Sequence, residues 1–527
     1  MRKITKIFVP AVCAVMLVFA WSCNDAWEKH YSGLPGSKSE KNLYEYINSQ
    51  ADLSRFAEML RIAGYDSILS QPQTYTVWAP VNDALQSVDL TDTVTVTELV
   101  KNHITRFLHS TAGLESKTVY MLDKKFVLFK ASDNQFTFGG KVLIAGKSEI
   151  SVSNGLIHCI DGYVPYFTNI WEFIGKTPGL DSLRNFLYSQ SEYAFDADAS
   201  VEIGTNDHGQ AIYDSVITFT NPVLSQIGSI YVEDSVFSMI LPDNTAWQKA
   251  YNQIKNGYKI YGAGGAAQQR LNTQWAIVQN LVFRQLIDNP STPDSIVSTS
   301  GNVFKQPAYL FTNAVKHELS NGLAYITDSL RFSAADSWQK AIKVEAENSD
   351  YGRAYTFANL YVRSGLGTSY NVSDSKFLMV EPTSVSTQQQ NSVTFSIPNT
   401  LSGKYKIYCV FVPSKIVSET DVRPYRVSFY LSYMNSAGTI VTESAVDSKN
   451  ALIGSGKTGA TFTTSGTEIT KQYVTQIEFP YCNLIKDKSE ASLVNVKLKV
   501  KNDVPITSSA LYNRTFRVDY VILEPVK

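Results

Sequence analysis

Few side chains in this 527-residue sequence have the types and spacing that catalysis requires. Residues 451–458 match the relaxed pattern of a phosphate-binding loop, which needs a buried strand before it and a helix after it. Polar residues 447–450 precede the pattern and a Gly-, Thr- and Ser-rich stretch follows it, so we expect a hairpin loop. No two histidines have the spacing of a zinc-protease helix, and no serine lies in a nucleophile elbow. The sequence therefore predicts a protein that is not an enzyme.

The amino terminus has the pattern of an exported, lipid-anchored protein. Basic residues precede an apolar run at 7–20, which is shorter than a membrane-spanning helix needs. The run ends in Ala-Trp-Ser-Cys, which resembles the lipobox of bacterial lipoproteins, with Ala20 in place of the usual Leu. The resemblance implies a signal peptide at 1–22, an acylated Cys23 and a lipidated tether at 23–40. An ordinary signal peptide with an incidental cysteine is the alternative.

The residues that follow Cys23 indicate where the protein is displayed. Asn24, Asp25 and Glu28 resemble the acidic export signals of Bacteroidota-type surface lipoproteins. The resemblance implies attachment to the outer membrane through the lipid anchor, with the folded part on the cell surface. The net charge of −1 leaves no excess of Lys and Arg to neutralise phosphates, so we expect no nucleic-acid partner.

Three further cysteines, Cys159, Cys409 and Cys482, each lie in an apolar or aromatic stretch that resembles a strand. We expect buried and unreactive thiols, because small apolar side chains of this kind are commonly found in cores. A disulfide between Cys409 and Cys482 is the alternative, since spacing alone does not establish a pairing.

Helical signals open the region that follows the tether. Leu53, Phe56, Ala57 and Leu60 recur at the spacing of one helix face. Gly64 stands where that helix would stop. The spacing therefore predicts a helix that packs on a core.

A strand is expected at 74–80, after which Asn82 can cap a short helix. A further helix contains His103, and a strand-like stretch at 153–161 follows, in which an Asn-Gly pair makes a tight turn. A similar series of elements recurs downstream, so residues 41–336 contain an internal repeat.

Two stretches of the first repeat resemble the signature boxes of fasciclin-type domains. Thr-Val-Trp-Ala-Pro-Val-Asn-Asp-Ala-Leu at 76–85 is similar to the first box, and Ser-Asn-Gly-Leu-Ile-His-Cys-Ile-Asp at 153–161 to the second. Both boxes recur in degenerate form, at 237–247 and 320–328. The resemblance implies two fasciclin-like α/β domains, at 41–170 and 180–336.

The histidines of the first repeat are not shared by the second. Tyr325 stands in place of His158, and Gln285 lies near the place of His103. His158 alternates with apolar residues along a predicted strand, so it shares their face. We expect His158 to be a hydrogen-bonded structural histidine rather than a ligand or an acid–base group.

From residue 341 the chain has the pattern of an all-β domain. Alternating or aromatic-rich runs are separated by Ser, Asn, Gly and Pro, which favours a sandwich or jelly roll. Residues 343–348 and 516–523 resemble the opening and closing strands of galactose-binding-like carbohydrate-binding modules. We therefore expect a multidomain α+β chain in which two fasciclin-like α/β domains precede a β-sandwich at 341–527.

The resemblance to carbohydrate-binding modules implies a structural calcium ion. In that family, carboxylates near the two ends of the domain bind the ion, and hard carboxylate oxygens suit Ca²⁺. By position the candidates are Glu345, Glu347 and Asp519. A solvated pair of glutamates is the alternative.

The same resemblance implies a sugar site built from loop aromatics. Such side chains stack on the faces of pyranose rings, while polar side chains bind the hydroxyl groups. The candidates are Tyr351, Tyr355, Tyr361 and Tyr370. A role in the core or at a sheet edge is their alternative.

These patterns predict a non-enzymatic surface lipoprotein that binds or presents a polysaccharide or oligosaccharide. Fasciclin-like lipoproteins of this kind resemble accessory components of outer-membrane glycan-uptake systems, so a transporter complex is an expected partner. The alternative is an adhesion or assembly protein that binds another protein through its fasciclin-like domains. Exposed Tyr or Phe on the third domain would favour the first function, and a broad apolar patch on the fasciclin-like domains the second.

Overall fold

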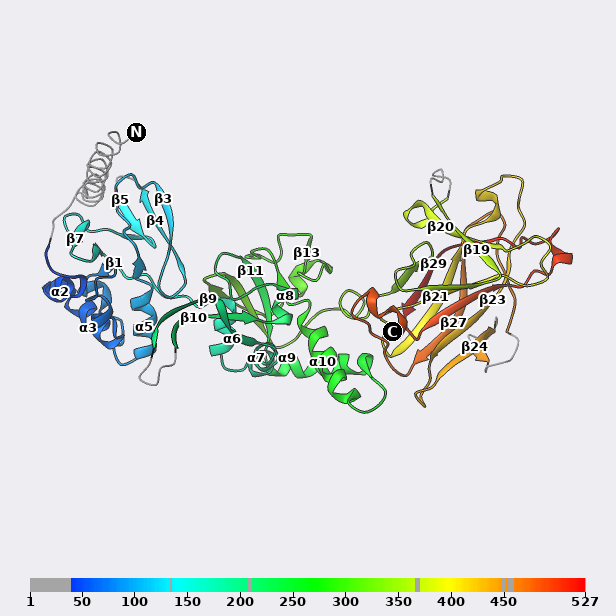
Figure 1. Cartoon of the computed structure of the whole chain (residues 1–527), viewed down its shortest axis with the longest axis horizontal. Helices are drawn as coiled ribbons and strands as arrows, with labels where there is room; N and C mark the ends of the chain where they lie inside the picture. Colours follow the sequence, from blue (N-terminus) through cyan, green and yellow to red (C-terminus); the bar gives the residue numbers. More distant parts are fainter. Residues whose placement is uncertain are drawn as a thin grey trace, which may run out of the picture. The chain divides into compact units, whose positions relative to one another are not determined.

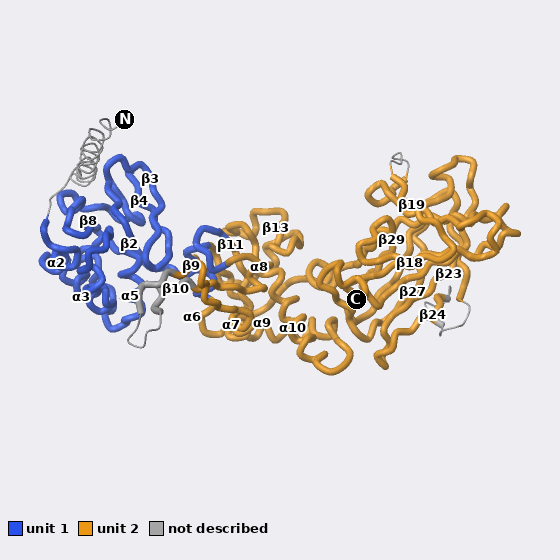
Figure 2. Tube along the Cα trace, in the orientation of Figure 1, with its two compact units in different colours: residues 1–173, 230–236, 319–321 blue, residues 174–229, 237–318, 322–527 orange. Residues whose placement is uncertain are grey.

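The computed structural model describes residues 39–132, 135–205, 211–364, 370–446, 451–453 and 459–526. Cys23, the predicted signal peptide, the tether up to residue 38 and residues 454–458 of the phosphate-loop pattern lie outside the described residues. The chain divides into two compact units, coloured separately in Figure 2. Unit 1 comprises residues 1–173, 230–236 and 319–321, and unit 2 comprises residues 174–229, 237–318 and 322–527. The division into domains at 41–170, 180–336 and 341–527 stays a prediction.

Short helices open unit 1 (Figure 1). They are α2 (Leu43–Asn48), η1 (Ala51–Leu53), α3 (Ser54–Ile62), α4 (Tyr65–Ile68), η2 (Asn82–Leu85) and α5 (Thr93–Lys101). A capping box starts α2, because the Asn42 side chain accepts from the Glu45 amide and the Glu45 carboxylate accepts from the Asn42 amide. Phe56 and Leu60 of α3 are fully buried, and Gly64, with φ of +72°, follows the helix in the left-handed region. The helix predicted from the apolar spacing is confirmed.

Two sheets complete unit 1. In the first, β1 (Tyr75–Pro80) lies parallel to β8 (Gly155–Ile160), and the strand order is β2-β1-β8-β7, with β2 at Ile104–Arg106 and β7 at Ile150–Val152. The second is antiparallel and contains β3 (Ser116–Tyr120), β4 (Phe126–Ser132), β5 (Gln135–Phe138) and β6 (Lys141–Val142). Both central strands of the first sheet are buried along their whole length.

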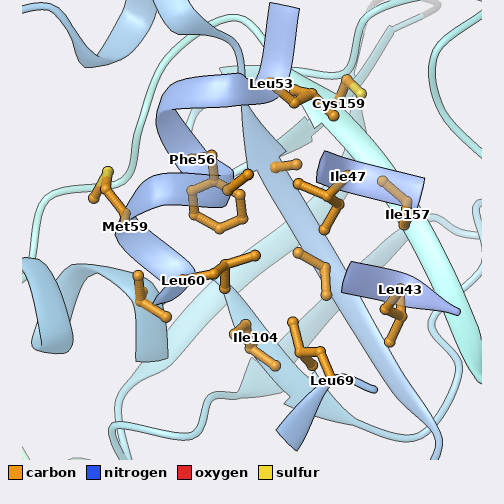
Figure 3. Close-up of a cluster of buried hydrophobic side chains, with 14 of the residues drawn as sticks. Leu43, Ile47, Leu53, Phe56, Met59, Leu60, Leu69, Ile104, Ile157 and Cys159 are labelled. Atoms are coloured by element: carbon orange, nitrogen blue, oxygen red, sulfur yellow. The ribbon is translucent and has the colours of Figure 1, made fainter. Parts of the chain in front are cut away.

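The side chains of β1 alternate between two cores. Val77 belongs to the core that the helices form with β8, in which Phe56, Leu60 and Ile157 lie (Figure 3). Trp78 belongs to a separate core formed with the antiparallel sheet. The first sheet is therefore covered by helices on one face and by the second sheet on the other.

The first part of unit 2 repeats the strand order of unit 1. β11 (Phe237–Pro242) lies parallel to β16 (Gly322–Thr327), in a sheet ordered β12-β11-β16-β15. Its helices are α7 (Asp181–Ser189), α8 (Pro222–Ile227), α9 (Asn244–Ile254), η3 (Lys255–Tyr258), α10 (Gly265–Val278) and η4 (Pro307–Tyr309); α6 (Ile170–Lys176) precedes them. Its other strands are β9 (Glu192–Thr205), β10 (Ala211–Thr220), β12 (Val282–Phe283), β13 (Ser295–Val297), β14 (Val303–Lys305) and β15 (Val315–Leu319).

The last part of unit 2 is a β-sandwich. One sheet has the order β19-β20-β29-β22-β27, with β17 on β29, and the other β18-β21-β28-β23-β24-β25, with β26 on β23. Aromatic contacts join the sheets, since the rings of Phe411 and Phe429 lie 6.2 Å apart and those of Tyr433 and Phe479 5.9 Å apart. The predicted α+β fold class, with an all-β sandwich after the α/β repeats, is confirmed.

The strands of the sandwich are antiparallel and reach ten residues in β27 and β29. They are β17 (Ile342–Glu345), β18 (Arg353–Thr356), β19 (Ala358–Ser364), β20 (Lys376–Pro382), β21 (Ser392–Ser396), β22 (Gly403–Phe411), β23 (Arg426–Met434), β24 (Ile440–Val446), β25 (Ala451–Ile453), β26 (Phe462–Thr463), β27 (Thr470–Phe479), β28 (Lys497–Asn502) and β29 (Phe516–Pro525). Short 3-10 helices interrupt them at Ser373–Ser375 (η5), Ser414–Ile416, Lys488–Leu493 and Ile506–Ser508.

Three details of the sequence prediction are corrected or resolved. The predicted helix does not contain His103, because α5 ends at Lys101 and β2 begins at Ile104. Asn82 does not cap η2, because it lies inside that helix and Val81 is the N-cap. Its side chain accepts instead from the Arg55 amide at 2.9 Å, near the start of α3. Cys409 and Cys482 are free thiols, so they do not form a bridge. Burial raises the pKa of Cys482 to about 12, as expected for an unreactive thiol.

Within the described ranges, the helices are all too short or too polar to cross a membrane.

Candidate functional site

The chain passes from one sheet of the sandwich to the other at a single edge. β18 is the outermost strand of one sheet and β19 the outermost strand of the other. Phe357 joins them with φ of +51°, in the left-handed region that a non-glycine residue rarely adopts. This tight connection turns the backbone between the sheets, so that aromatic residues on either side of Phe357 lie along the same edge.

Three aromatic side chains on this edge are exposed to solvent. The exposed fraction is 59% for Tyr355, 45% for Phe357 and 42% for Tyr361. The guanidinium of Arg363 lies 5.4 Å from the centroid of the Tyr361 ring. We call Tyr355, Phe357 and Tyr361 the aromatic edge. Rings of this size are usually buried, so three of them exposed within seven residues mark a surface suited to binding.

Tyr351 lies just before β18 but has different surroundings. It is half-buried and lines a cavity of about 110 Å³ together with Glu345, Asn348, Phe395 and Ser396. The cavity is smaller than a typical ligand pocket, so it could admit one small polar group and not a sugar ring.

Tyr370 is not brought to the aromatic edge. Its ring packs against a buried cluster that includes Val372, Phe377 and Val412. Its hydroxyl donates to the Thr467 carbonyl oxygen at 3.3 Å. These contacts place Tyr370 in the packing of the sandwich, the alternative role that the sequence left open.

The structure brings the three predicted calcium ligands into one neighbourhood. Asp519 on β29 is almost fully buried, and both of its carboxylate oxygens accept from the Ser373 amide, at 3.1 and 3.3 Å. The Ser373 hydroxyl donates to Glu345 at 2.8 Å. Burial, together with the nearby charge of Glu345, raises the pKa of Asp519 to about 7. Burial and the charge of Glu345 also raise the pKa of Glu347.

Whether these three carboxylates suit a bound cation depends on which of their oxygens already have a partner. One oxygen of Glu345 and one of Glu347 are buried without a hydrogen-bond partner among the described residues, as an oxygen-binding cation would require. The other oxygen of Glu345 lies 2.5 Å from the Lys343 ammonium, which already supplies a positive charge there. In the part of the chain that the structure describes, no three His, Cys, Asp or Glu side chains converge as metal ligands do. Calcium binding therefore stays a prediction.

His158 has the structural role that the strand pattern predicts. It is fully buried, and its Nε2 lies 2.8 Å from the His109 carbonyl oxygen. Burial lowers the pKa of His158, so the neutral imidazole is the form present in the fold.

The sequence prediction missed Phe357. A signal was present, since Tyr355 and Phe357 are two residues apart, a spacing that places side chains of a regular strand on one face. What the sequence could not show is the positive φ at Phe357, which depends on the two sheets that it joins.

Comparisons with known proteins identify a family model that matches part of the first repeat. The family model described as Fasciclin domain matches residues 51–164. No curated protein matches the chain. Among solved structures, a FAS1 domain pair from the insect cell adhesion molecule fasciclin I is 13% identical, with 54% of this chain and 98% of that chain covered and a TM-score of 0.21.

Two carbohydrate-binding modules are also similar. A xylan-binding domain of family 22 is 11% identical, with 34% of this chain and 92% of that chain covered and a TM-score of 0.21. A family 35 module from Clostridium thermocellum is 13% identical, with 36% and 99% covered and a TM-score of 0.19. At the level of a family, the chain is thus similar to the Fasciclin domain over residues 51–164.

Proposed function

We propose that this protein is a non-enzymatic, cell-surface lipoprotein that binds a polysaccharide or oligosaccharide through the aromatic edge of its β-sandwich. The observation that carries the proposal is the exposure of Tyr355, Phe357 and Tyr361 where β18 passes into β19. The C–H faces of pyranose rings are apolar and flat, so they stack on exposed aromatic rings. Exposed aromatics in a row can hold successive sugars of one chain.

The proposed location rests on the amino-terminal sequence. Acylation of Cys23 would attach the protein to the outer membrane, since each buried CH₂ of a lipid chain contributes about 0.8 kcal/mol and several chains give a stable anchor. The bound glycan would then be presented to an outer-membrane glycan-uptake system, with its transporter complex as partner.

A glycan array with the full chain tests the binding function. We expect the double variant Tyr355→Ala/Tyr361→Ala to bind at least about tenfold more weakly than the wild type, because two stacking surfaces are removed. Tyr309→Ala is the matched control, since Tyr309 is 64% exposed but lies in η4, outside the sandwich. Equal binding by the double variant and the control would exclude the aromatic edge as the sugar site.

Calcium and the lipid anchor each have a separate test. Sugar binding that is lost with a chelator would support Glu345, Glu347 and Asp519 as calcium ligands, and binding that persists would leave the sugar site without a metal.

The Cys23→Ala variant, with its signal peptide cleaved, should be released from membranes. Retention of that variant in the membrane fraction would refute lipid anchoring.

One observation favours the adhesion alternative. Tyr120, Phe126 and Leu128 are exposed on β3 and β4, and the register pairs Tyr120 with Phe126 and places Leu128 on the same face. The ring centroids of Tyr120 and Phe126 lie 5.0 Å apart. Such an apolar strip is typical of a protein-binding surface. If this surface is the functional one, Tyr120→Ala/Phe126→Ala would abolish cell attachment while glycan arrays show no ligand.

A further inference from the structure

Helices α7, α9 and α10 of unit 2 line a cavity that is suited to a ligand. α9 packs against both α7 and α10, and the three helices line a cavity of about 660 Å³. That volume lies within the usual range of ligand pockets, about 300–1,000 Å³. We call this cavity the helical groove. Its lining comes entirely from the second repeat and includes no residue of the aromatic edge.

The apolar lining of the helical groove is aromatic. Phe186 and Trp247 are buried with ring centroids 6.0 Å apart, and they form its floor. Tyr251 follows Trp247 by one helical turn on α9 and is partly exposed. No Leu, Ile, Val or Met side chain lines the groove. Grooves that receive amphipathic helices present broad hydrophobic surfaces for several anchor residues, whereas flat rings alone suit the C–H faces of sugars.

The polar lining consists largely of side-chain amides. Asn185, Gln248 and Gln274 line the groove, and none of them donates or accepts a side-chain hydrogen bond within the described residues. The NH₂ group of a side-chain amide donates hydrogen bonds and its carbonyl oxygen accepts them. These amides can therefore bind the hydroxyl groups of a sugar both as donors and as acceptors. This lining fits a neutral, hydroxyl-rich surface on the ligand.

One cation completes the groove. Arg270 on α10 is exposed, and its guanidinium makes no salt bridge or side-chain hydrogen bond with any residue that the structure describes. No Asp or Glu lines the groove. A guanidinium binds a carboxylate or sulfate through two parallel hydrogen bonds, so an unpaired Arg270 favours a ligand with such a group. A second cation lies nearby, since the Lys255 ammonium is 6.0 Å from the centroid of the Tyr251 ring. Two cations in a protein without excess positive charge do not favour a nucleic acid.

We propose that the helical groove binds an acidic oligosaccharide, with a sugar ring on Tyr251, hydroxyl groups on the amides and a carboxylate or sulfate on Arg270. The site belongs to the second repeat. In the first repeat, the four-residue η2 stands where the eleven-residue α9 stands in the second. Leu85 follows Asn82 by three residues, as Trp247 follows Asn244, and the chain then leaves the helix before it reaches an equivalent of Tyr251.

Calorimetric titration of the full chain tests the charge. The probes are short oligogalacturonides, which carry carboxylates and no sulfate, the same oligomers with methyl-esterified carboxyl groups, and sulfated galactan oligosaccharides, which carry sulfates and no carboxylate. We expect one acidic series to bind about tenfold more tightly than the methyl-esterified series, and Arg270→Gln to remove that difference. Lys305→Gln is the control, because it removes one positive charge from an exposed position on β14, outside the groove.

Two further variants test whether the acidic probe binds in the helical groove. Tyr251→Ala should also weaken binding of the acidic probe, with thermal unfolding used to verify that the variant is folded. Tyr355→Ala/Tyr361→Ala should bind the acidic probe normally, which separates this site from the aromatic edge. Unchanged binding by Arg270→Gln, an equal loss in Lys305→Gln, or no affinity of the wild type for either acidic series would overturn the proposal. Equally tight, Arg270-dependent binding of a polyglutamate peptide would also overturn it, in favour of a protein ligand.

Discussion

The first and second repeats hold the asparagine of their second box in the same way. In the first, the Asn154 side chain accepts from the amide of Leu43, the first residue of α2, at 2.8 Å. It donates to the carbonyl oxygens of Leu69 and Gln71, at 2.8 and 2.6 Å. One buried amide thereby satisfies three backbone groups that no sheet or helix pairs.

In the second repeat Asn321 makes the equivalent set. Its side chain accepts from the amide of Ile170, the first residue of α6, at 2.9 Å. It donates to the carbonyl oxygens of Ile230 and Val232, at 2.8 and 3.1 Å. The sequences around these partners differ, so what the repeats share is the requirement to pair buried backbone groups.

A second shared position is filled by different side chains. His158 lies opposite Trp78 in the parallel register, and Tyr325 lies opposite Ile240. His158 contacts the His109 carbonyl oxygen, and the Tyr325 hydroxyl donates to that of Ile287. An imidazole and a phenol thus make the same kind of contact to a backbone carbonyl oxygen, as a structural role at this position predicts.

The repeats differ at the position of His103. The His103 carbonyl oxygen accepts from the Trp78 amide at 3.0 Å, and in the second repeat the Leu281 carbonyl oxygen accepts from the Ile240 amide at 2.9 Å. Leu281, not Gln285, is therefore the equivalent of His103, and the sequence prediction was wrong. The different helix lengths of the two repeats shift the sequence spacing, so only the strand register identifies the partner.

Substitution of Lys125, which has no lysine equivalent in the second repeat, should lower the free energy of unfolding more than any other change considered below. Its side chain is 5% exposed, and its ammonium lies 2.7 Å from Glu172 and 2.5 Å from Glu233. At the matching place before β14 the second repeat has Asn302, whose amide donates to Asn280 at 2.5 Å. We expect Lys125→Met to lower the free energy of unfolding by about 3–5 kcal/mol, because two carboxylates lose their partner. Denaturant unfolding measures the change.

The control for Lys125→Met is a surface pair in the same unit. Lys147 lies 2.6 Å from Asp52, and both side chains are exposed. Lys147→Met should change stability little, since solvent screens exposed pairs. Similar losses in the two variants would show that the Lys125 ammonium is not buried between its carboxylates.

The two box asparagines should contribute similarly. Asn154→Ala leaves three backbone groups without a partner, whereas Asn321→Ala leaves two, because the Ile230 carbonyl oxygen still accepts from the Trp171 amide at 3.4 Å. We expect each substitution to cost about 2–3 kcal/mol of unfolding free energy. Chemical denaturation monitored by tryptophan fluorescence provides the measurement, and Asn252→Ala on the exposed face of α9 is the control. A large loss in one repeat with none in the other would break the equivalence drawn here.

The smallest effect concerns pH and should be confined to the first repeat. Burial lowers the pKa of His103 from 6.5 to about 4. Its Nδ1 lies 2.8 Å from the Leu99 carbonyl oxygen, and its Nε2 accepts from the Val164 amide at 3.0 Å, so the neutral ring uses both nitrogens. Below pH 6.5 the His103 imidazole is protonated in the unfolded chain but stays neutral in the folded chain. The free energy of unfolding therefore decreases as the pH falls from 6.5 towards 4.

Between about pH 7.5 and about pH 5.5 this group should account for a loss of about 1 kcal/mol. His103→Leu, which copies the second repeat, should be less stable at neutral pH but should show a shallower decline. The difference between wild type and variant isolates His103 from Asp123, whose pKa burial raises to about 7 and which acts in the opposite direction. Parallel pH curves for the two proteins would contradict the assignment.

Local sequence patterns correctly predict many of the secondary-structure elements. Apolar spacing predicts α3, the two boxes predict strands at 74–80 and 153–161, and alternation predicts that His158 is structural, because these features depend on neighbours a few residues apart. The prediction of no nucleic-acid partner likewise rests on net charge, which is a sum over residues and needs no fold.

Which side chains meet depends on the tertiary packing. Asn82 bonds to α3 rather than to its own helix, Tyr370 is partly buried against a hydrophobic cluster of the sandwich, and Phe357 turns the chain between two sheets. The helical groove likewise needs α7, α9 and α10, whose lining residues lie up to 92 positions apart, from Ser182 to Gln274. Local sequence sets which elements form, but a surface made from distant elements exists only once their packing has placed them together.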